Sequence, residues 1–216
     1  MKKYKNRDMA GQCLLELLSQ YDRCPEAIVI GLARGGVPVA YEIALGLRLP
    51  LAVLAVRKIT APGFQEIVLG AIAPSEALKL NEDLIEQQQM DKNALDHLIK
   101  IEIKALQYQV ETYQGEKDFP NLIGKTVILV DDGIATGASM HAAITSVLKA
   151  KPAKIVVAVP VASPQCVQEL KLRVDAIICP LQPLELKSIS VWYETFNPIT
   201  DEAVVEKLGQ CYSKKP

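Results

Sequence analysis

Five short apolar runs recur along the chain, each too short for a typical helix and without the alternation of a half-exposed strand. Runs of this kind are typical of strands that are buried on both faces, as in a parallel sheet. We therefore expect a central sheet of five strands. They occupy residues 27–32, 51–56, 126–130, 155–159 and 176–179.

Segments with helical spacing of apolar residues lie between these runs. The spacing i, i+3, i+4, i+7 occurs within residues 10–17, 40–47 and 140–148. Strands that alternate with helices are typical of α/β proteins, in which crossover helices cover both faces of the sheet. The pattern thus predicts a doubly wound parallel sheet.

The connection between the second and third runs is much longer than one crossover helix requires. Residues 59–73 combine short apolar runs with Pro62, Gly63 and Gly70, which predicts a hairpin or a mobile flap. Residues 81–113 have helical spacing on two neighbouring stripes, an apolar arc wider than that of a simple surface helix. Such a helix either packs in the core or covers a partner subunit, so a homodimer is one alternative.

Composition narrows the class of protein. The 216 residues include 24 Lys and Arg against 25 Asp and Glu, and the net charge of −1 gives no general attraction for nucleic acids or acidic membranes. The 5 cysteines show no CxxC spacing, which argues against a zinc site or a disulfide framework. No apolar run approaches the roughly 18 residues of a membrane span. We expect one domain over residues 1–216, in a cytoplasmic protein.

The segment after the third strand carries the most specific pattern in the chain. It reads VILVDDGIATGASM over residues 127–140: an apolar strand, then Asp131 and Asp132, then a short loop that leads into a helix. Amide groups at a helix N-terminus bind phosphate, and the helix dipole adds to this attraction. The amides that we expect to bind it belong to Thr136, Gly137, Ala138 and Ser139.

Two adjacent carboxylates beside a phosphate site repel the phosphate unless they bind hydroxyl groups or a cation. Asp131 and Asp132 therefore indicate a ribose diol, with or without Mg²⁺ nearby. The alternative is that both side chains only cap the turn between strand and helix. That alternative leaves the order of the other residues in the segment unexplained.

This segment resembles the phosphoribosyl diphosphate signature of the type I phosphoribosyltransferases, in which apolar residues, two acids and a TG(G/A)(S/T) loop occur in this order. The resemblance implies that Asp131 and Asp132 hold the ribose hydroxyls and that Ala135 to Ser139 bind the 5′-phosphate. It implies a sheet of strand order 3-2-1-4-5 and a small C-terminal hood over residues 181–212. Mg²⁺ would be held through the substrate and water near the two aspartates.

The turn ARGG after the first strand looks like the pyrophosphate loop of the same family. Glycine pairs start many helices, so it is the place after the first strand that favours a binding role. Arg34 would supply a cation, and in relatives this loop often has a non-proline cis peptide bond. The residues of the turn are Ala33, Arg34, Gly35 and Gly36.

Over most of its length, including RKITAPGFQE at 57–66, the chain resembles a group of predicted phosphoribosyltransferases of uncertain substrate. Arg57 and Lys58 end the second strand, which places them on the ligand side unless they are ordinary surface charges. Residues 59–118 would contain a lid and a helical insert. Closure of the lid would exclude water from the reacting sugar.

The acceptor is less well defined. Ala135 stands where several 6-oxopurine enzymes have an aspartate that assists the purine ring, so that carboxylate is missing. Adenine-type members have alanine there and use a glutamate of the lid. Glu66 is the carboxylate that we assign to this role, with a solvated side chain as the alternative. In SVWYETF, residues 190–196, Trp192 or Tyr193 would contact a base, or both pack in the core.

The resemblance implies Mg²⁺-dependent transfer of 5-phosphoribosyl from phosphoribosyl diphosphate to a small nitrogenous acceptor, most simply a nucleobase, with release of pyrophosphate. Asp131, Asp132, Arg34 and Glu66 are the expected catalytic residues. Positioning and charge stabilisation would supply most of the catalysis. One alternative is a non-catalytic regulator that binds the diphosphate or a nucleotide. Another is cleavage of a phosphoester at the same loop.

Overall fold

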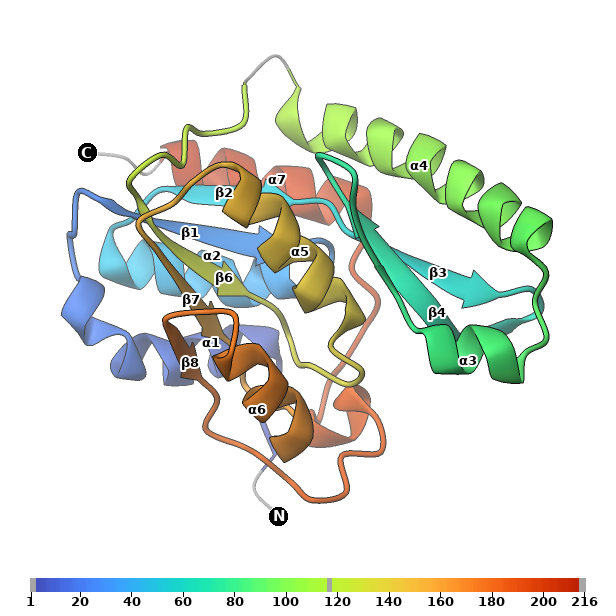
Figure 1. The fold of residues 1–216 in the computed structure, drawn as a ribbon. Coiled ribbons are helices and arrows are strands. Elements are labelled where there is room, and N and C mark those ends of the chain that lie inside the picture. Colours follow the sequence, from blue (N-terminus) through green and yellow to red (C-terminus); the bar gives the residue numbers. More distant parts are fainter. Residues whose placement is uncertain (1–2, 116–117, 214–216) are drawn as a thin grey trace.

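The computed structural model has a five-stranded parallel sheet at its centre (Figure 1). The structure describes residues 3–115 and 118–213, so residues 116–117 of the expected insert lie outside the described residues. The sheet has the order β2-β1-β6-β7-β8 and every neighbouring pair is parallel, which confirms the expected α/β class. Its strands are β1 (Ala27–Leu32), β2 (Leu51–Leu54), β6 (Thr126–Val130), β7 (Lys154–Ala158) and β8 (Ala176–Ile178).

The order of the strands differs from the expected 3-2-1-4-5. Counted along the five predicted strands of this chain, it is 2-1-3-4-5, because β6 lies beside β1 and β2 forms the edge. The chain leaves β1 through α2 (Gly36–Leu47) toward one side, and after the insert it returns to the other side of β1. Such a reversal opens a crevice at the carboxyl ends of the two strands beside it.

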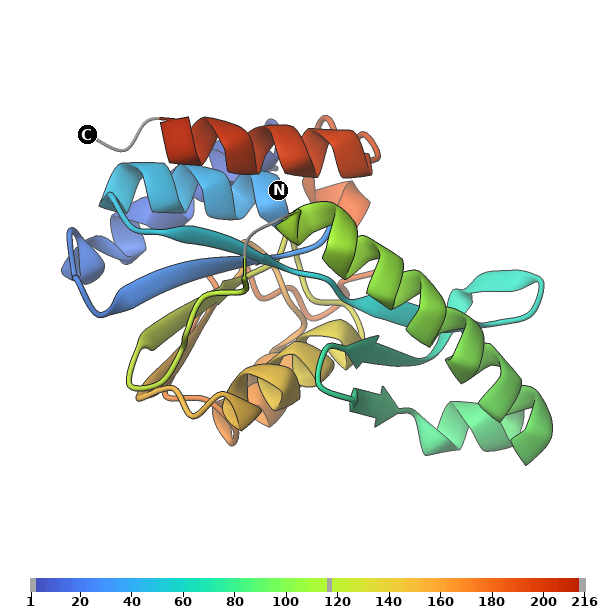
Figure 2. The ribbon, with the colours of Figure 1, turned by 90° about the horizontal axis from the view of Figure 1, so that it is seen from above.

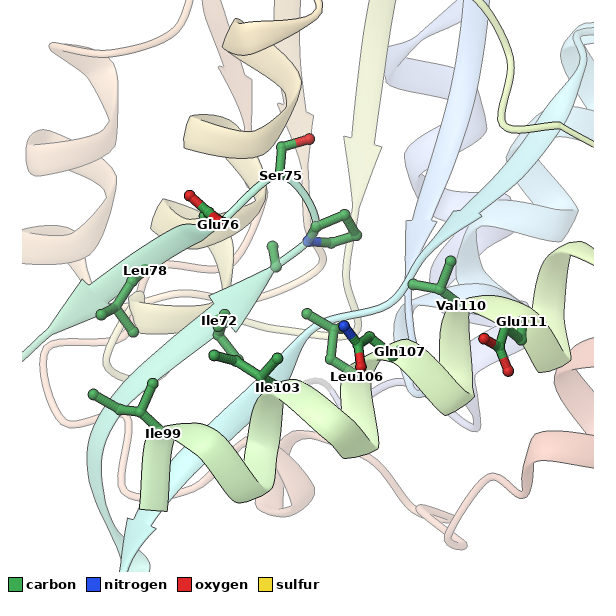
Figure 3. Close-up of a pocket in the computed structure, with 12 residues that line it drawn as sticks. Ile72, Ser75, Glu76, Leu78, Ile99, Ile103, Leu106, Gln107, Val110 and Glu111 are labelled. Carbon is green, nitrogen blue, oxygen red and sulfur yellow. The ribbon is translucent and has the colours of Figure 1, made fainter. Parts of the chain in front are cut away.

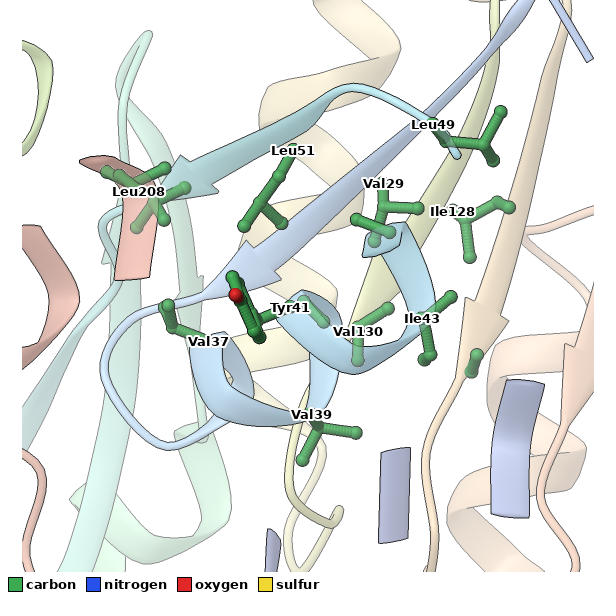
Figure 4. Close-up of a cluster of buried hydrophobic side chains, with 14 of the residues drawn as sticks. Val29, Val37, Val39, Tyr41, Ile43, Leu49, Leu51, Ile128, Val130 and Leu208 are labelled. Atoms are coloured by element: carbon green, nitrogen blue, oxygen red, sulfur yellow. The ribbon is translucent and has the colours of Figure 1, made fainter. Parts of the chain in front are cut away.

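Residues along each strand alternate between two cores, which explains the unbroken apolar runs. In β1, Ala27 and Val29 face a cluster with α2, whereas Ile28 and Ile30 face the opposite cluster. Figure 2 shows that helices cover both faces of the sheet. Figure 4 shows part of the first cluster, where Tyr41 lies among aliphatic side chains. The helices are α1 (Arg7–Leu17), α2 and α7 (Asp201–Ser213) on one face against α5 (Ala138–Lys149) and α6 (Pro164–Lys171) on the other.

The long connection forms a separate small sheet with two helices. Strands β3 (Arg57–Ala61), β4 (Phe64–Ala73) and β5 (Ala77–Leu80) are antiparallel, so the predicted hairpin is present. Helices α3 (Glu82–Gln87) and α4 (Lys92–Gln114) pack against it, around a core of their own. A cluster of small side chains joins this sheet to α5: Ala71, Ala73, Ala77 and Ala142.

The two apolar stripes of α4 have different surroundings. Leu106, Gln109 and Tyr113 are buried, and the two apolar ones pack in the core that α2 and α7 share. Ile101 and Tyr108, on the other stripe, are 48% and 68% exposed. Core packing therefore accounts for one stripe, and a homodimer over the other stays a prediction.

The chain beyond β8 divides into two parts. Up to Thr200 it is irregular apart from the short 3-10 helix η2 (Ile189–Trp192), and it pairs with the N-terminal segment through the backbone of Tyr4 and Tyr193. Helix α7 then packs against α2, α4 and β2. A further 3-10 turn, η1 (Ser19–Tyr21), follows α1. None of the helices in the described part of the chain has the length and apolar character needed to cross a bilayer.

Candidate active site

A cavity of about 740 Å³ lies at the carboxyl ends of β1 and β6, in the crevice that the strand order creates. Its lining includes residues 33–35, 57–58 and 131–139, which are three of the segments singled out in the sequence. Basic side chains and loop amides, which bind anions, therefore line one space together with the two carboxylates.

A second cavity, of about 570 Å³, lies between α4 and the turn from β4 to β5 (Figure 3). Its walls are mainly apolar, with Ile72, Ile103 and Leu106 among them, and Glu76 and Glu111 bring only negative charge. A phosphate group finds no cation in this lining, so the first cavity is the candidate site.

The loop after β6 has the geometry of an anion site. Gly137 caps α5 with a φ of 77°, a left-handed conformation that favours glycine. The first amides of a helix lack intrahelical acceptors, so those of α5 are available to a ligand at this N-terminus. Behind the loop, the thiol of Cys166 donates to the carbonyl of Ala135 at 3.2 Å. The loop sequence carries no signal for this support, because Cys166 lies on α6.

The carboxylate pair sits directly at the end of β6. Oδ1 of Asp131 accepts a hydrogen bond from the backbone amide of Asp132 at 2.9 Å. Burial, together with the charge of Asp132, raises the pKa of Asp131 well above its usual range. Burial also raises the pKa of Asp132, although Arg7 acts in the opposite direction. A ligand or ion that supplies positive charge or hydroxyl donors would therefore stabilise the two carboxylates.

Arg7 also belongs to the site, although the sequence did not predict a role for it. Its Nε lies 2.8 Å from Oδ2 of Asp132, and both side chains are largely buried, at 9% and 13% exposed. Its Nη1 donates to the carbonyl of Asn197 at 2.8 Å, and its guanidinium lies 3.7 Å from the ring centroid of Phe196. Arg7 thus joins the carboxylate pair to the C-terminal segment. A lone arginine in a basic N-terminus gives no sequence signal for such a role.

The loop after β1 fits closely against the carboxylate pair. A Cβ at Gly35 would lie 2.0 Å from Oδ2 of Asp132, and a Cβ at Gly36 would lie 2.5 Å from the carbonyl oxygen of Val130. The peptide bond between Ala33 and Arg34 is cis. These two glycines therefore let the loop and the strand end meet.

The charged residues that open the hairpin also reach the cavity. Nε of Arg57 lies 2.7 Å from Oε2 of Glu102 on α4, and both side chains line the cavity. Lys58 is exposed and lines it too, and its charge partly offsets the effect of burial on the pKa values of Asp131 and Asp132. The lining is therefore positive on the hairpin side.

Four of the expected site residues lie outside the lining: Gly36, which packs against the end of β6, and Glu66, Trp192 and Tyr193. Glu66 is exposed on β4, so a role in proton transfer requires that the hairpin move, and it stays a prediction. Trp192 and Tyr193 are each 4% exposed. The indole donates to the carbonyl of Leu186, and the Tyr193 hydroxyl donates to the carbonyl of Asp132 at 2.7 Å. Core packing, the other interpretation, therefore accounts for Trp192 and Tyr193. The aromatic side chain of this segment that lines the cavity is Phe196.

Asp131→Asn is expected to stabilise the fold, because it removes a charge that burial and Asp132 disfavour. Relief of one poorly compensated buried group gives about 1 kcal/mol, or roughly 2–4 °C in melting temperature for a chain of this size. The pKa of Asp131 is higher in the folded protein than in the unfolded chain, so the stability of wild type falls as the pH rises from about 4 to the folded pKa. The advantage of the variant grows over the same interval. Above the folded pKa the advantage is constant.

Thermal unfolding between pH 4 and pH 8 measures this effect, with Asp132→Asn as the matched control. Arg7 compensates part of the charge on Asp132, so that neighbouring change should raise the melting temperature less than Asp131→Asn does. An Asp131→Asn protein less stable than wild type at pH 8 would contradict the account of the pair.

Comparisons with known proteins agree with this geometry. A family model described as the phosphoribosyl transferase domain matches residues 4–182. A protein of Mycobacterium tuberculosis (strain H37Rv), described as an inferred phosphoribosyl transferase, is 34% identical over 212 residues, which make up 98% of this chain and 48% of that protein. The chain thus spans about half the length of the curated relatives it matches.

Solved structures share the architecture. The crystal structure of TT1426 from Thermus thermophilus superposes with a TM-score of 0.75 and 36% identity, covering 96% of this chain and 98% of that chain. The AQ2163 protein of Aquifex aeolicus shares the fold alone, with a TM-score of 0.52, 12% identity and coverage of 82% and 74%. Since the family match takes in both loops and the carboxylate pair, the chain belongs to the phosphoribosyl transferase domain family.

Proposed function

We propose that this chain binds phosphoribosyl diphosphate in the cavity between β1 and β6 and transfers its 5-phosphoribosyl group to an acceptor nitrogen. The observation that carries the proposal is the meeting of the glycine loop, the carboxylate pair and the N-terminus of α5 around one cavity. The 5′-phosphate fits the amides at 135–139, the ribose diol fits the carboxylates, and the pyrophosphate fits the loop at 33–36. A nucleobase is the acceptor that we favour.

The reaction needs positioning and charge stabilisation rather than a covalent intermediate. The lone pair of the acceptor nitrogen forms the bond to C1′, while the bond from C1′ to the pyrophosphate oxygen breaks and its electrons leave with pyrophosphate. The acceptor proton passes to Glu66, where the hairpin closes over the cavity, or to water. Arg34, Arg57 and Lys58 are the cations that would stabilise the leaving group.

Mg²⁺ fits this site as part of the bound substrate. Burial raises the pKa values of Asp131 and Asp132, so their ionised forms lack solvation that a nearby cation would replace. Among the described residues no group of three His, Cys, Asp or Glu side chains is placed to hold a metal, so substrate oxygens and water would complete the coordination shell. When bound, the ion would neutralise charge on the diphosphate.

Titration calorimetry with phosphoribosyl diphosphate tests the proposal, followed by a nucleobase panel assayed for pyrophosphate release. We expect binding that weakens at least tenfold in EDTA, because the diphosphate then meets the two carboxylates without a counter-ion. Ribose 5-phosphate is the control ligand, since it lacks the diphosphate and should respond less to EDTA. Equal affinity for phosphoribosyl diphosphate with and without metal would contradict the proposal, and binding without turnover of any base would favour the regulator.

Ligand binding is expected to order the hairpin formed by β3 and β4. Its turn at Pro62 and Gly63 is exposed, and the pairing register shifts on either side of Thr60, so the tip has fewer regular hydrogen bonds than the base. Hydrogen exchange over residues 59–68 should slow severalfold in saturating phosphoribosyl diphosphate and Mg²⁺. The buried strand β7 is the control peptide, which should not change. Unchanged exchange in the hairpin would exclude a closing lid.

A further inference from the structure

Arg34 is tied to two helices outside the ligand loops. Its Nε lies 2.8 Å from Oδ1 of Asp201, and its Nη2 lies 3.2 Å from Oδ2, so the carboxylate at the start of α7 grips one edge of the guanidinium. The hydroxyl of Tyr113 on α4 donates to Oδ1 of the same carboxylate. One turn earlier, Nε2 of Gln109 donates to the Tyr113 oxygen at 3.2 Å. Asp201, Tyr113 and Gln109 together are called the Arg34 tether below.

The direction of each hydrogen bond in the tether is fixed. Tyr113 has one hydroxyl proton, and that proton goes to Asp201, so its oxygen can only accept from the amide nitrogen of Gln109. The amide therefore turns its Oε1 away, and this buried atom has no hydrogen-bond partner among the described atoms. Partial burial raises the pKa of Asp201, but the hydrogen bonds from Tyr113 and Arg34 outweigh it and lower the pKa overall. The tether thus maintains an ionised carboxylate that faces Arg34.

The hydrogen bonds to Asp201 occupy one edge of the Arg34 guanidinium and leave the Nη1 end for another acceptor. A guanidinium has five N–H donors in a planar fork, and Asp201 uses the edge formed by Nε and Nη2. Nη1 makes no hydrogen bond to Asp201, and Arg34 lines the cavity. An arginine already held in one orientation loses less rotamer freedom when it binds an anion.

We propose that Asp201, supported by Tyr113 and Gln109, is a positioning residue that aims the Nη1 end of Arg34 at the pyrophosphate group of the donor. This role rests on the proposed function. In this role, α4 and α7 control the affinity for pyrophosphate, although both helices lie outside the two ligand loops.

A simple electrostatic view predicts the opposite sign. A carboxylate beside an anion site repels the anion, so its removal would tighten binding. If Asp201 acts by positioning Arg34, its removal weakens binding, and only while Arg34 is present. The two views are therefore separable by a double-mutant cycle.

Calorimetry with pyrophosphate and with ribose 5-phosphate tests the role in wild type, Asp201→Ala, Arg34→Ala and the double variant. We expect Asp201→Ala to weaken pyrophosphate binding five- to twentyfold, with ribose 5-phosphate within twofold of wild type. In the Arg34→Ala background, the change at Asp201 should have no further effect. Tyr113→Phe, which removes only the hydroxyl, should weaken pyrophosphate two- to threefold, and Asp201→Asn, which keeps one acceptor, should fall between wild type and Asp201→Ala.

Three results would overturn the role of Asp201. They are pyrophosphate binding in Asp201→Ala that equals or exceeds wild type, an equal loss for both ligands, and a loss that persists in the Arg34→Ala background. A wild-type protein that binds ribose 5-phosphate but no pyrophosphate would instead refute the proposed function, and this role with it. The two failures are distinguishable because only the second appears in wild type.

Discussion

Asp131→Asn combined with Asp132→Asn is expected to lower pyrophosphate release by about 10²- to 10⁴-fold. Each carboxylate is proposed to accept a hydrogen bond from the ribose diol, and a hydrogen bond to a charged group contributes about 1.5–3 kcal/mol. Two such losses amount to roughly 3–6 kcal/mol in the barrier, at tenfold for each 1.36 kcal/mol. A coupled assay for pyrophosphate measures the effect. Until an acceptor is known, the affinity for phosphoribosyl diphosphate takes the place of turnover.

The affinity for free pyrophosphate is the internal control for the double variant. Asn keeps the size of the side chain, so the close fit between Gly35 and the residue at 132 is retained. With less negative charge beside the loop at 33–36, pyrophosphate should bind as tightly as in wild type, or more tightly. Circular dichroism establishes that the variant is folded. Full activity, or a loss of pyrophosphate binding equal to the loss of turnover, would refute the assignment of the diol to this pair.

Gly36→Ala is expected to destabilise the fold by roughly 2–3 kcal/mol. The new Cβ would lie 2.5 Å from the carbonyl oxygen of Val130 and 2.8 Å from Cα of Asp131, and both are backbone atoms that cannot rotate away. The melting temperature should fall by roughly 5–10 °C for a chain of this length. Because the clash lies at the end of β6, the affinity for phosphoribosyl diphosphate should fall as well.

The matched control is Gly209→Ala, within helix α7. A Cβ there meets no atom within 4 Å, and the residue is exposed. Alanine in place of glycine in a helix stabilises by up to about 1 kcal/mol, so the same chemical change should have the opposite sign. A Gly36→Ala protein as stable as wild type would show that the loop and the strand end separate easily, contrary to the close fit described above.

Local pattern predicts the central architecture well, because a strand buried on both faces must be apolar at every position. The five apolar runs all contain strands, and the phosphate loop can be located because its glycine and its helix start within a few residues of the two aspartates. The strand order could not be derived in this way. It depends on which side of β1 the chain returns to after the long insert, and no residue of β6 encodes that choice.

Local pattern does not predict the remaining residues of the site, for a different reason. Arg7 and Asp201 are ordinary charged residues in their own segments, and each acquires a role only through a partner far away in the chain. Gln109 lies on an apolar stripe of α4, where its spacing indicates packing and nothing more. Trp192 and Tyr193 illustrate the reverse, since an aromatic pair beside a predicted ligand site has the same local pattern whether it lines a pocket or fills a core.

The contact between Arg7 and Asn197 also bears on the order of events during synthesis, because 190 positions separate the two residues. At typical elongation rates of about 5–20 residues per second, Arg7 waits roughly 10–40 s for this partner to be made. The strands from β1 to β8 and both ligand loops precede Asn197 in the chain, so the sheet can assemble before the arginine is enclosed. A chain that ends between β8 and Asn197 therefore contains every strand of the sheet but lacks the segment that encloses Arg7.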